Sequence, residues 1–183
     1  TPGISSAASD VYKRQGLGLL SLKIIQAAYS INPIVVDIDD EKLLLAKQAG
    51  ASEVINSRDE KLYEKIAEFT NGGATSVIDF VGAAETFDLA SGMFGMKRGG
   101  TYVIVGLIGG ETNLQLPMTT LTARTIKGVY VGSLKEMGEL MKLVREGKIE
   151  HVNVEKRDAS CANETLNDLK NGKINGLVCL THE

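Results

Sequence analysis

The chain has 183 residues, of which 43% are hydrophobic and 23% charged, and its formal net charge is −3. This composition is typical of one globular domain with a sizeable core. The balance of charge gives no reason to expect a nucleic acid or an anionic membrane surface as partner. No apolar run approaches the roughly 20 residues that span a bilayer, so we expect no membrane segment either.

Residues 1–15 read TPGISSAASDVYKRQ, a small, polar stretch that becomes basic and lacks the apolar core of a signal peptide. The stretch resembles translated adapter sequence fused to a truncated reading frame. We therefore expect a non-native leader, and a native leader is the alternative.

From Gly16 onward, strand and helix patterns alternate at short spacing. A first apolar helix is expected over residues 19–28. The expected strands cover residues 33–38, 52–56, 75–82, 101–110 and 124–133, with two more near 152–156 and 174–180. The expected helices cover residues 39–50, 59–73, 83–100, 133–147 and 162–170, and a longer loop contains Pro117.

Two of these helices have clear internal patterns. In the second half of the chain, Ser133 and Glu136 have the spacing of a capping box. An apolar stripe follows at helical spacing, formed by Leu134, Met137, Leu140, Met141 and Val144. In the helix expected over 59–73, Leu62, Ile66 and Phe69 are spaced to share one face.

Strands separated by helices of 10–15 residues predict parallel pairing with right-handed crossovers. The fold class is therefore α/β, with a doubly wound, mostly parallel sheet of the Rossmann type. In such sheets the ligand lies at the carboxyl ends of the strands, with phosphates at the amino end of the first helix.

The parts of a dinucleotide site occur at suitable spacing. Gly16 and Gly18 open the first helix, and Asp37 ends the next strand, 19 residues after Gly18. An acid at that position accepts hydrogen bonds from the adenosine ribose hydroxyls. The alternative role of Asp37 is to cap the next helix, although Asp39 and Asp40 already serve that purpose. The run of acids disfavours a 2′-phosphate by roughly 1 to 4 kcal/mol, so NAD is expected rather than NADP.

Cysteine usage indicates a reducing, cytoplasmic setting. Cys161 and Cys179 lie far apart in apolar or helical segments, which favours two buried free thiols. Neither these cysteines nor His151 and His182 form a cluster with the spacing of metal ligands. The sequence therefore predicts no metal site in this chain.

Taken in order, several segments resemble the cofactor domain of zinc-type, medium-chain alcohol dehydrogenases. They read GLGLLSLKIIQA, VVDIDDEKLLLAKQAGASEVIN, VIDFVG, KRGGTYVIVGL and TIKGVYVGS. The resemblance implies an NAD-binding domain over residues 16–132. It also implies that residues 133–183 form a helix and a return segment toward a catalytic domain absent from this sequence.

The resemblance implies roles for single residues. Gly16, Leu17 and Gly18 match the end of the pyrophosphate turn, and Asp37 matches the ribose acid. The other matches are Lys42 at the adenosine ribose, Val81 and Gly82 beside that ribose, Val105, Gly106 and Leu107 at the nicotinamide carboxamide, and Val131 as a second main-chain contact to it. Lys42 could equally be a solvated helix lysine, and most of these valines would be core in any α/β sheet.

Two departures from the family pattern concern the same turn. The first two fingerprint glycines fall at Lys13 and Gln15, where left-handed backbone would cost about 1–2 kcal/mol. The first strand of the family, which is central in its sheet, is replaced by ASDVYKRQ. Its loss would leave two neighbouring strands with unpaired edges. We expect weak NAD binding at best.

The resemblance implies hydride transfer between a small alcohol or carbonyl compound and nicotinamide, with zinc present only in the parent enzyme. No catalytic residue can be named in this chain, which we expect to be inactive alone. A non-catalytic fragment and a piece of a zinc-independent quinone or enoyl reductase are the alternatives. Relatives pair through the edge strand, so a homo-oligomer through TIKGVYV and the preceding loop is expected. The return segment should leave Leu166, Leu169, Leu177 and Val178 partly exposed.

Overall fold

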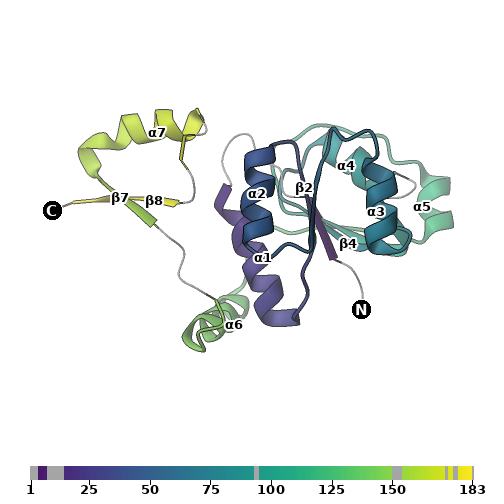
Figure 1. Ribbon diagram of the computed structural model, residues 1–183, viewed down its shortest axis with the longest axis horizontal. Coiled ribbons are helices and arrows are strands. Elements are labelled where there is room, and N and C mark those ends of the chain that lie inside the picture. Colours follow the sequence, from purple (N-terminus) through teal and green to yellow (C-terminus); the bar gives the residue numbers. More distant parts are fainter. Residues whose placement is uncertain are drawn as a thin grey trace.

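The computed structural model describes residues 4–7, 15–92, 95–149, 154–171, 173–174 and 177–182. Their main feature is a parallel sheet with the strand order β3-β2-β1-β4-β5-β6 (Figure 1). The strands are β1 Ile4–Ala7, β2 Ile34–Asp37, β3 Glu53–Asn56, β4 Ala74–Asp79, β5 Met96–Ile104 and β6 Thr125–Gly128. This is the strand order of a doubly wound dinucleotide-binding sheet, so the predicted fold class is confirmed.

Helices cover both faces of this sheet. The helices of this part are α1 Gln15–Tyr29, α2 Asp40–Gln48, α3 Leu62–Thr70, α4 Ala84–Ser91, α5 Leu116–Thr122 and α6 Leu134–Arg145, of which α6 packs on α1. Successive residues of β2 show the two layers, because side chains alternate between the faces of a strand. Val35 packs in one core cluster with Leu22 of α1 and Leu43 of α2. Ile34 and Val36 pack in another, which contains Leu62 and Ile66 of α3.

The centre of the sheet differs from the sequence-based expectation. A first strand is present, because β1 pairs in parallel with β2 on one side and with β4 on the other. The prediction that its replacement would leave both neighbours with unpaired edges is therefore wrong. Strand pairing uses main-chain groups, so a short run of small residues can satisfy it without the apolar pattern of a buried strand. The interpretation of residues 1–15 as a non-native leader stays a prediction.

Two further boundaries differ. The helix expected over 83–100 ends at Ser91, and β5 starts at Met96 rather than 101, with a register irregularity against β4. The loop around Pro117 contains helix α5, in which this proline occupies the first turn. A proline is favourable there because its missing N–H needs no partner.

The apolar patterns of α3 and α6 were only partly interpreted correctly. In α3 the buried face is Leu62, Ile66 and Thr70, whereas Phe69 is exposed. The capping box of Ser133 and Glu136 is present in α6. The stripe that follows this box is largely unburied, and Leu134 is 93% exposed.

The C-terminal part forms a small unit set apart from the sheet (Figure 1). It consists of β7 Val154–Asp158, a short helix η1 Ala159–Cys161, helix α7 Ala162–Lys170 and β8 Leu177–Thr181, with β7 and β8 parallel. As expected, its apolar side chains are partly exposed at the four predicted positions, Leu166, Leu169, Leu177 and Val178. Both cysteines are free, but neither is buried, because Cys179 lies on the exposed β8 and Cys161 on η1.

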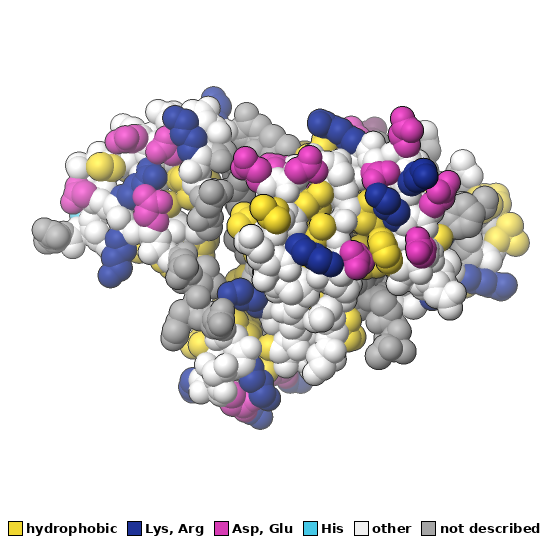
Figure 2. Space-filling view, viewed as in Figure 1, with side chains coloured by type: hydrophobic (Ala, Val, Ile, Leu, Met, Phe, Trp, Pro, Cys, Tyr) yellow, Lys and Arg dark blue, Asp and Glu magenta, His cyan; other side chains and the backbone are white. Residues whose placement is uncertain are grey.

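On the face shown in Figure 2, acidic and basic side chains are interspersed. Within the described part of the chain, no helix is both long and apolar enough to cross a membrane.

Candidate cofactor site

The predicted site residues meet at one edge of the sheet because all six strands are parallel. Asp37 ends β2, and Gly82, Gly106 and Val131 follow β4, β5 and β6 respectively. The amino end of α1 follows β1, which lies between β2 and β4. Read across the sheet, these positions form one continuous row along the carboxyl ends of the strands. That edge is where doubly wound sheets bind their ligands.

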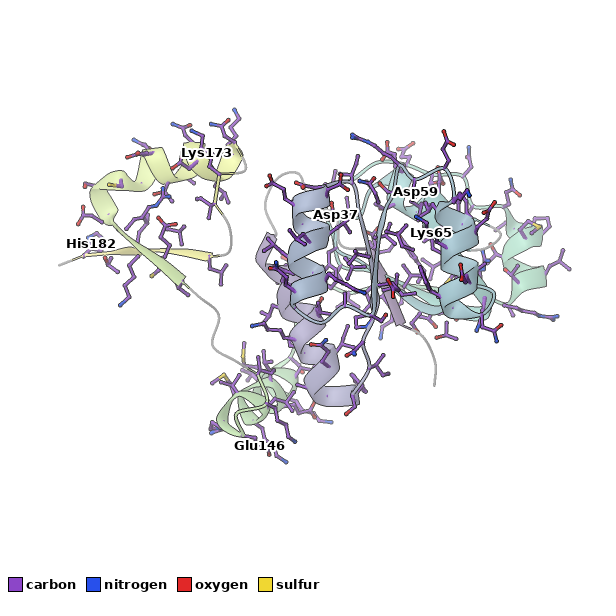
Figure 3. The ribbon with its side chains drawn as sticks, viewed as in Figure 1. Asp37, Asp59, Lys65, Glu146, Lys173 and His182 are labelled. Atoms are coloured by element: carbon purple, nitrogen blue, oxygen red, sulfur yellow. The ribbon has the colours of Figure 1, made fainter. Side chains whose placement is uncertain are left out.

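Asp37 begins the row and is buried, at 4% exposure (Figure 3). Its Oδ1 accepts hydrogen bonds from the backbone N–H of Ile38 at 2.7 Å and of Asp39 at 3.0 Å. These two N–H groups hold Oδ1 at the end of β2. Burial raises the pKa of Asp37 to about 6, although these N–H groups and the nearby Lys42 act in the opposite direction.

The alternative capping role of Asp37 is filled by its neighbour. Asp39 is the N-cap of α2, and its Oδ1 accepts from the backbone N–H of Glu41 at 2.9 Å and of Lys42 at 3.4 Å. Asp40 accepts a hydrogen bond from the Asn56 side chain. Asp37 therefore caps no helix.

Helix α1 starts at Gln15, earlier than expected, so Gly16, Leu17 and Gly18 form its first turn. The first N–H groups of a helix have no partner within the helix, and they attract anions. Gln15 has helical backbone, so the expected left-handed strain does not arise at that position. Lys13, the other position where a glycine was expected, lies outside the described residues.

The ends of β4 and β5 touch through two glycines. A Cβ placed on Gly82 would lie 2.1 Å from the carbonyl oxygen of Gly106, and one on Gly106 would lie 2.0 Å from the carbonyl carbon of Val81. Gly82 also has φ of +66°, in the left-handed region. Both positions therefore require glycine, and backbone forms the surface that a ligand would meet here.

The predicted residues differ in accessibility. Val81 is buried, which agrees with its alternative role as a core residue. Leu107, in contrast, lies beyond the end of β5 and is 64% exposed. Val131 is 76% exposed and has φ of 50°. That conformation is unusual for a β-branched side chain, and such strain clusters at ligand sites.

Sequence reasoning missed three residues that organise this edge. Asp79 ends β4 fully buried, and it accepts hydrogen bonds from Thr86 of α4 and from Tyr102 of β5. Burial, reinforced by this bond to Asp79, raises the pKa of the Tyr102 hydroxyl, which stays a donor at ordinary pH. A usable signal was the acid inside the otherwise apolar strand VIDFVG, because a buried acid needs partners.

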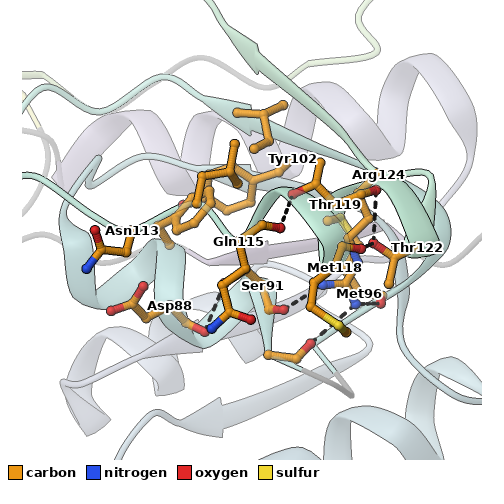
Figure 4. A pocket seen from close by; sticks show the side chains of 14 residues that line it. Asp88, Ser91, Met96, Tyr102, Asn113, Gln115, Met118, Thr119, Thr122 and Arg124 are labelled. Carbon is orange, nitrogen blue, oxygen red and sulfur yellow. Dashed lines mark hydrogen bonds between the residues drawn. The ribbon is translucent and has the colours of Figure 1, made fainter.

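Two cavities lie near the β5–β6 side of the sheet. One of about 380 Å³ is lined by Gly82 and Asp79 together with Gly109 and Gly110. The other, of about 500 Å³, lies between α4 and α5 (Figure 4), and none of the predicted site residues lines it. Its wall includes Arg124, whose guanidinium donates to the carbonyl groups of Ser91, Gly92 and Met96. We assign the first cavity to the candidate site because Gly82, one of the two touching glycines, lines it.

Residues 16–146 match the family model described as zinc-binding dehydrogenase. The chain belongs to this family. An alcohol dehydrogenase of Geobacillus stearothermophilus is 34% identical over 93% of this chain and 49% of its own length. An NAD-dependent alcohol dehydrogenase of Sulfurisphaera tokodaii is 32% identical over 88% of this chain and 46% of its own length. The resemblance inferred from the sequence motifs is thus confirmed.

A solved alcohol dehydrogenase from Aeropyrum pernix superposes on 99% of this zinc-binding dehydrogenase family member with a TM-score of 0.82 and 28% identity. The match covers 51% of that chain. This family member therefore spans about half the length of the relatives it matches. Within its described residues, no group of three or more His, Cys, Asp or Glu side chains is placed to hold a metal ion. Those residues do not fit a zinc site.

Proposed function

We propose that this chain is the cofactor-binding portion of an NAD-dependent, zinc-type alcohol dehydrogenase. The whole enzyme would transfer hydride between a small alcohol or carbonyl compound and nicotinamide. The observation that carries the proposal is the row along one sheet edge, from the buried carboxylate of Asp37 to the touching glycines Gly82 and Gly106. We propose zinc only for the whole enzyme, because the described residues of this chain do not fit a zinc site.

Each part of the row has a task in this proposal. The carboxylate of Asp37 accepts hydrogen bonds from the adenosine ribose, and Lys42 lies close enough to lower the pKa of that carboxyl. The first turn of α1, with Gly16 and Gly18, faces the two phosphates. Leu107 and Val131 flank the nicotinamide end, where exposed backbone offers hydrogen-bonding groups to the carboxamide.

The acids around β2 favour NAD over NADP. Asp37 would lie next to the position of a 2′-phosphate, and Asp39, Asp40 and Glu41 follow within four residues. Repulsion of roughly 1 to 4 kcal/mol at about 4 Å corresponds to at least a fivefold difference in affinity.

Calorimetric titration of the 183-residue chain with NAD and with NADP tests this assignment. We expect NAD to bind with a dissociation constant above about 1 μM, weaker than about −8 kcal/mol, because the fingerprint turn lacks two glycines. NADP should bind at least fivefold more weakly. Asp37→Ser should weaken NAD binding and narrow the difference between the two cofactors.

Glu64→Gln is the matched control, because it likewise removes one negative charge, from an exposed side chain of α3. This variant should keep both the affinity for NAD and the preference over NADP. The proposal fails if the wild-type chain binds neither cofactor at millimolar concentration, or if Asp37→Ser leaves both affinities unchanged. We expect no alcohol oxidation by this chain in the same preparations.

We also propose that the protein forms a homo-oligomer through the outer edge of β6. In the described sheet β6 has a single neighbouring strand, β5. Ile126 of β6 and Val129, which directly follows this strand, are exposed, as are Leu116 and Leu121 of α5, which precedes it in the chain. Exposed apolar side chains beside an open strand edge are typical of a surface that pairs with another chain.

A further inference from the structure

Asp79 is a buried carboxylate for which the proposed cofactor contacts leave no direct role. It ends β4 at 0% exposure. Its Oδ1 accepts from the backbone N–H of Val81 at 2.8 Å and of Gly82 at 3.0 Å. Its Oδ2 accepts from the hydroxyl of Thr86 at 2.7 Å and from that of Tyr102. All four donors lie in the turn after β4, in α4 or in β5.

The main chain of the same residue holds the neighbouring turn. The carbonyl oxygen of Asp79 accepts from the backbone N–H of Val105 at 2.8 Å and of Gly106 at 3.0 Å. Two more hydrogen bonds join the turns directly, from Ile108 N–H to the Val81 carbonyl and from Gly109 N–H to the Gly82 carbonyl. The turns after β4 and β5 are thus fixed to each other around one residue.

These hydrogen bonds fix the contact between Gly82 and Gly106, which forms part of the surface that the cofactor would meet. Gly82 and Gly106 approach so closely that neither has room for a Cβ. Backbone in such close contact cannot slide without breaking the hydrogen bonds on both sides. The position of Gly82 relative to Gly106 therefore depends on the bonds that Asp79 makes.

We propose that Asp79 is a positioning residue that sets the relative placement of the two cofactor-facing turns, after β4 and after β5. The inference deepens the proposed function and rests on it for the identity of the ligand. Although Asp79 lines the cavity, each of its carboxylate oxygens already accepts two hydrogen bonds, so it offers the cofactor no acceptor. It acts through Gly82, beside the adenosine ribose, and through Gly106, at the nicotinamide end.

A carboxylate suits this task better than the isosteric amide. A carboxylate accepts two hydrogen bonds on each of its two oxygens, whereas an asparagine side chain accepts on one oxygen only and donates from its nitrogen. Asp79→Asn therefore keeps either the pair of backbone donors or the pair of hydroxyl donors. With its oxygen on the backbone N–H groups, the amide turns its own N–H groups toward the hydroxyls of Thr86 and Tyr102, which must then accept instead of donate. The bonds to the turn after β4 lose the charge of the carboxylate, which strengthens them, so this turn is held less firmly.

The test compares Asp79→Asn with Val77→Ala in the full chain. Val77 is buried in the same strand but contributes to the core cluster rather than to the turns. Each variant is titrated with NAD and with AMP at a temperature where both are folded, and melting temperatures are recorded alongside. We expect Asp79→Asn to bind NAD at least tenfold more weakly than the wild type. AMP binding should weaken by a smaller factor, because AMP lies beside Gly82 but does not reach Gly106, and Asp37 on β2 still holds its ribose. Val77→Ala should keep both affinities despite its lower melting temperature.

Equal NAD affinities for the two variants would overturn the inference, since Asp79 would then contribute stability alone. If Asp79→Asn does not fold, Tyr102→Phe takes its place. It removes one donor to Oδ2 and keeps the ring, which packs edge-on against Phe87 with centroids 5.2 Å apart. We expect Tyr102→Phe to weaken NAD binding more than AMP binding, as for Asp79→Asn, but by a smaller factor.

Amide hydrogen exchange tests the inference even if the wild type binds no nucleotide. Failure to bind a nucleotide would contradict the proposed function but would leave this test intact. Val105 and Gly106 bond to the carbonyl of Asp79 and not to its side chain. We expect their exchange to quicken at least tenfold in Asp79→Asn and to stay unchanged in Val77→Ala. Faster exchange confined to Val81 and Gly82 would show that the two turns are not coupled, and the inference would be wrong.

Discussion

At the scale of single residues, folding and ligand binding favour opposite ionisation states of the Asp37 carboxyl group. The carboxylate is 4% exposed, and burial raises its pKa to about 6. The ionised form that a ribose needs as acceptor is therefore the form that the folded protein disfavours. Such a conflict between stability and binding is typical of functional positions. The nearby Lys42 and two backbone N–H groups reduce the conflict without removing it.

Asp37→Asn should separate these two effects. The folded wild type binds the Asp37 proton more tightly than the unfolded chain does, so the contribution of this group to stability is greatest below about pH 4 and is lost as pH rises to about 6. The full loss is about 3 kcal/mol. Asparagine carries no charge and keeps an acceptor for Ile38 and Asp39. We expect the free energy of unfolding at pH 7.5 to rise by about 1–3 kcal/mol, while NAD affinity falls.

Urea unfolding between pH 4 and pH 8 measures this difference. Asp39→Asn is the control, because asparagine is as good an N-cap as aspartate, and its free energy of unfolding at pH 7.5 should stay close to that of the wild type. A variant Asp37→Asn that is less stable than the wild type at pH 7.5 would show that the carboxylate has a stabilising partner.

At the scale of elements, Arg124 joins three of them. It lies directly before β6, and its guanidinium donates to the carbonyls of Ser91 and Gly92 at the end of α4 and of Met96 at the start of β5 (Figure 4). Carbonyls at the end of a helix have no helical partner, and a cation there interacts favourably with the helix dipole. This contact explains how α4 ends at Ser91 with β5 only a few residues away.

Replacing Arg124 by methionine should lower the free energy of unfolding by about 2 kcal/mol, since hydrogen bonds to charged groups contribute about 1.5–3 kcal/mol each and burial of the charge offsets part of that. Lys127→Met removes an exposed cation from β6 and should change stability by less than about 0.5 kcal/mol. Urea unfolding at neutral pH compares the two. If Arg124→Met were as stable as the wild type, the cost of burying the guanidinium would equal the gain from its bonds.

At the scale of the whole molecule, apolar side chains are concentrated at the surface of the second half of the chain. Exposed large hydrophobic residues there include Leu107, Ile108, Leu116, Leu121, Tyr130, Val131, Leu134 and Met137. A monomer rarely exposes so many apolar side chains. The open edge of β6 lies within this region, which is why we place the proposed oligomer contact there.

Ile126→Pro should abolish self-association while keeping the sheet. Val129 N–H donates to the Ile104 carbonyl at 2.9 Å. Because N–H directions alternate along a strand, the N–H of Ile126 points to the open edge, where proline removes no bond to β5. Lys127→Pro is the contrasting variant, because it removes a bond to β5 and should lower stability. Sedimentation velocity should show an oligomer for the wild type and a monomer for Ile126→Pro; a monomeric wild type contradicts the proposal.

Much of the framework could be predicted from local patterns. The strands ending at Asp37 and Asn56, the capped helix α6 and helix α7 follow from hydrophobic period, caps and turn glycines, which are properties of neighbouring residues. Predictions were wrong where contacts with residues distant in the sequence determine burial or secondary structure. Phe69 has the spacing of a core residue, yet Thr70 is buried instead. Helix α5, rich in threonine, is a weak helix former by its residues alone.

The sequence by itself determined the order and type of most elements, the α/β class and the positions of Asp37, Gly82 and Gly106, because these depend on residue periodicity and on backbone positions that only glycine fits. The tertiary structure alone decided that a strand at Ile4–Ala7 fills the centre of the sheet, since main-chain pairing needs no side-chain pattern. It alone also revealed Asp79 as the link between two turns. The donors around that carboxylate come from segments up to 23 residues away, and only folding brings them together.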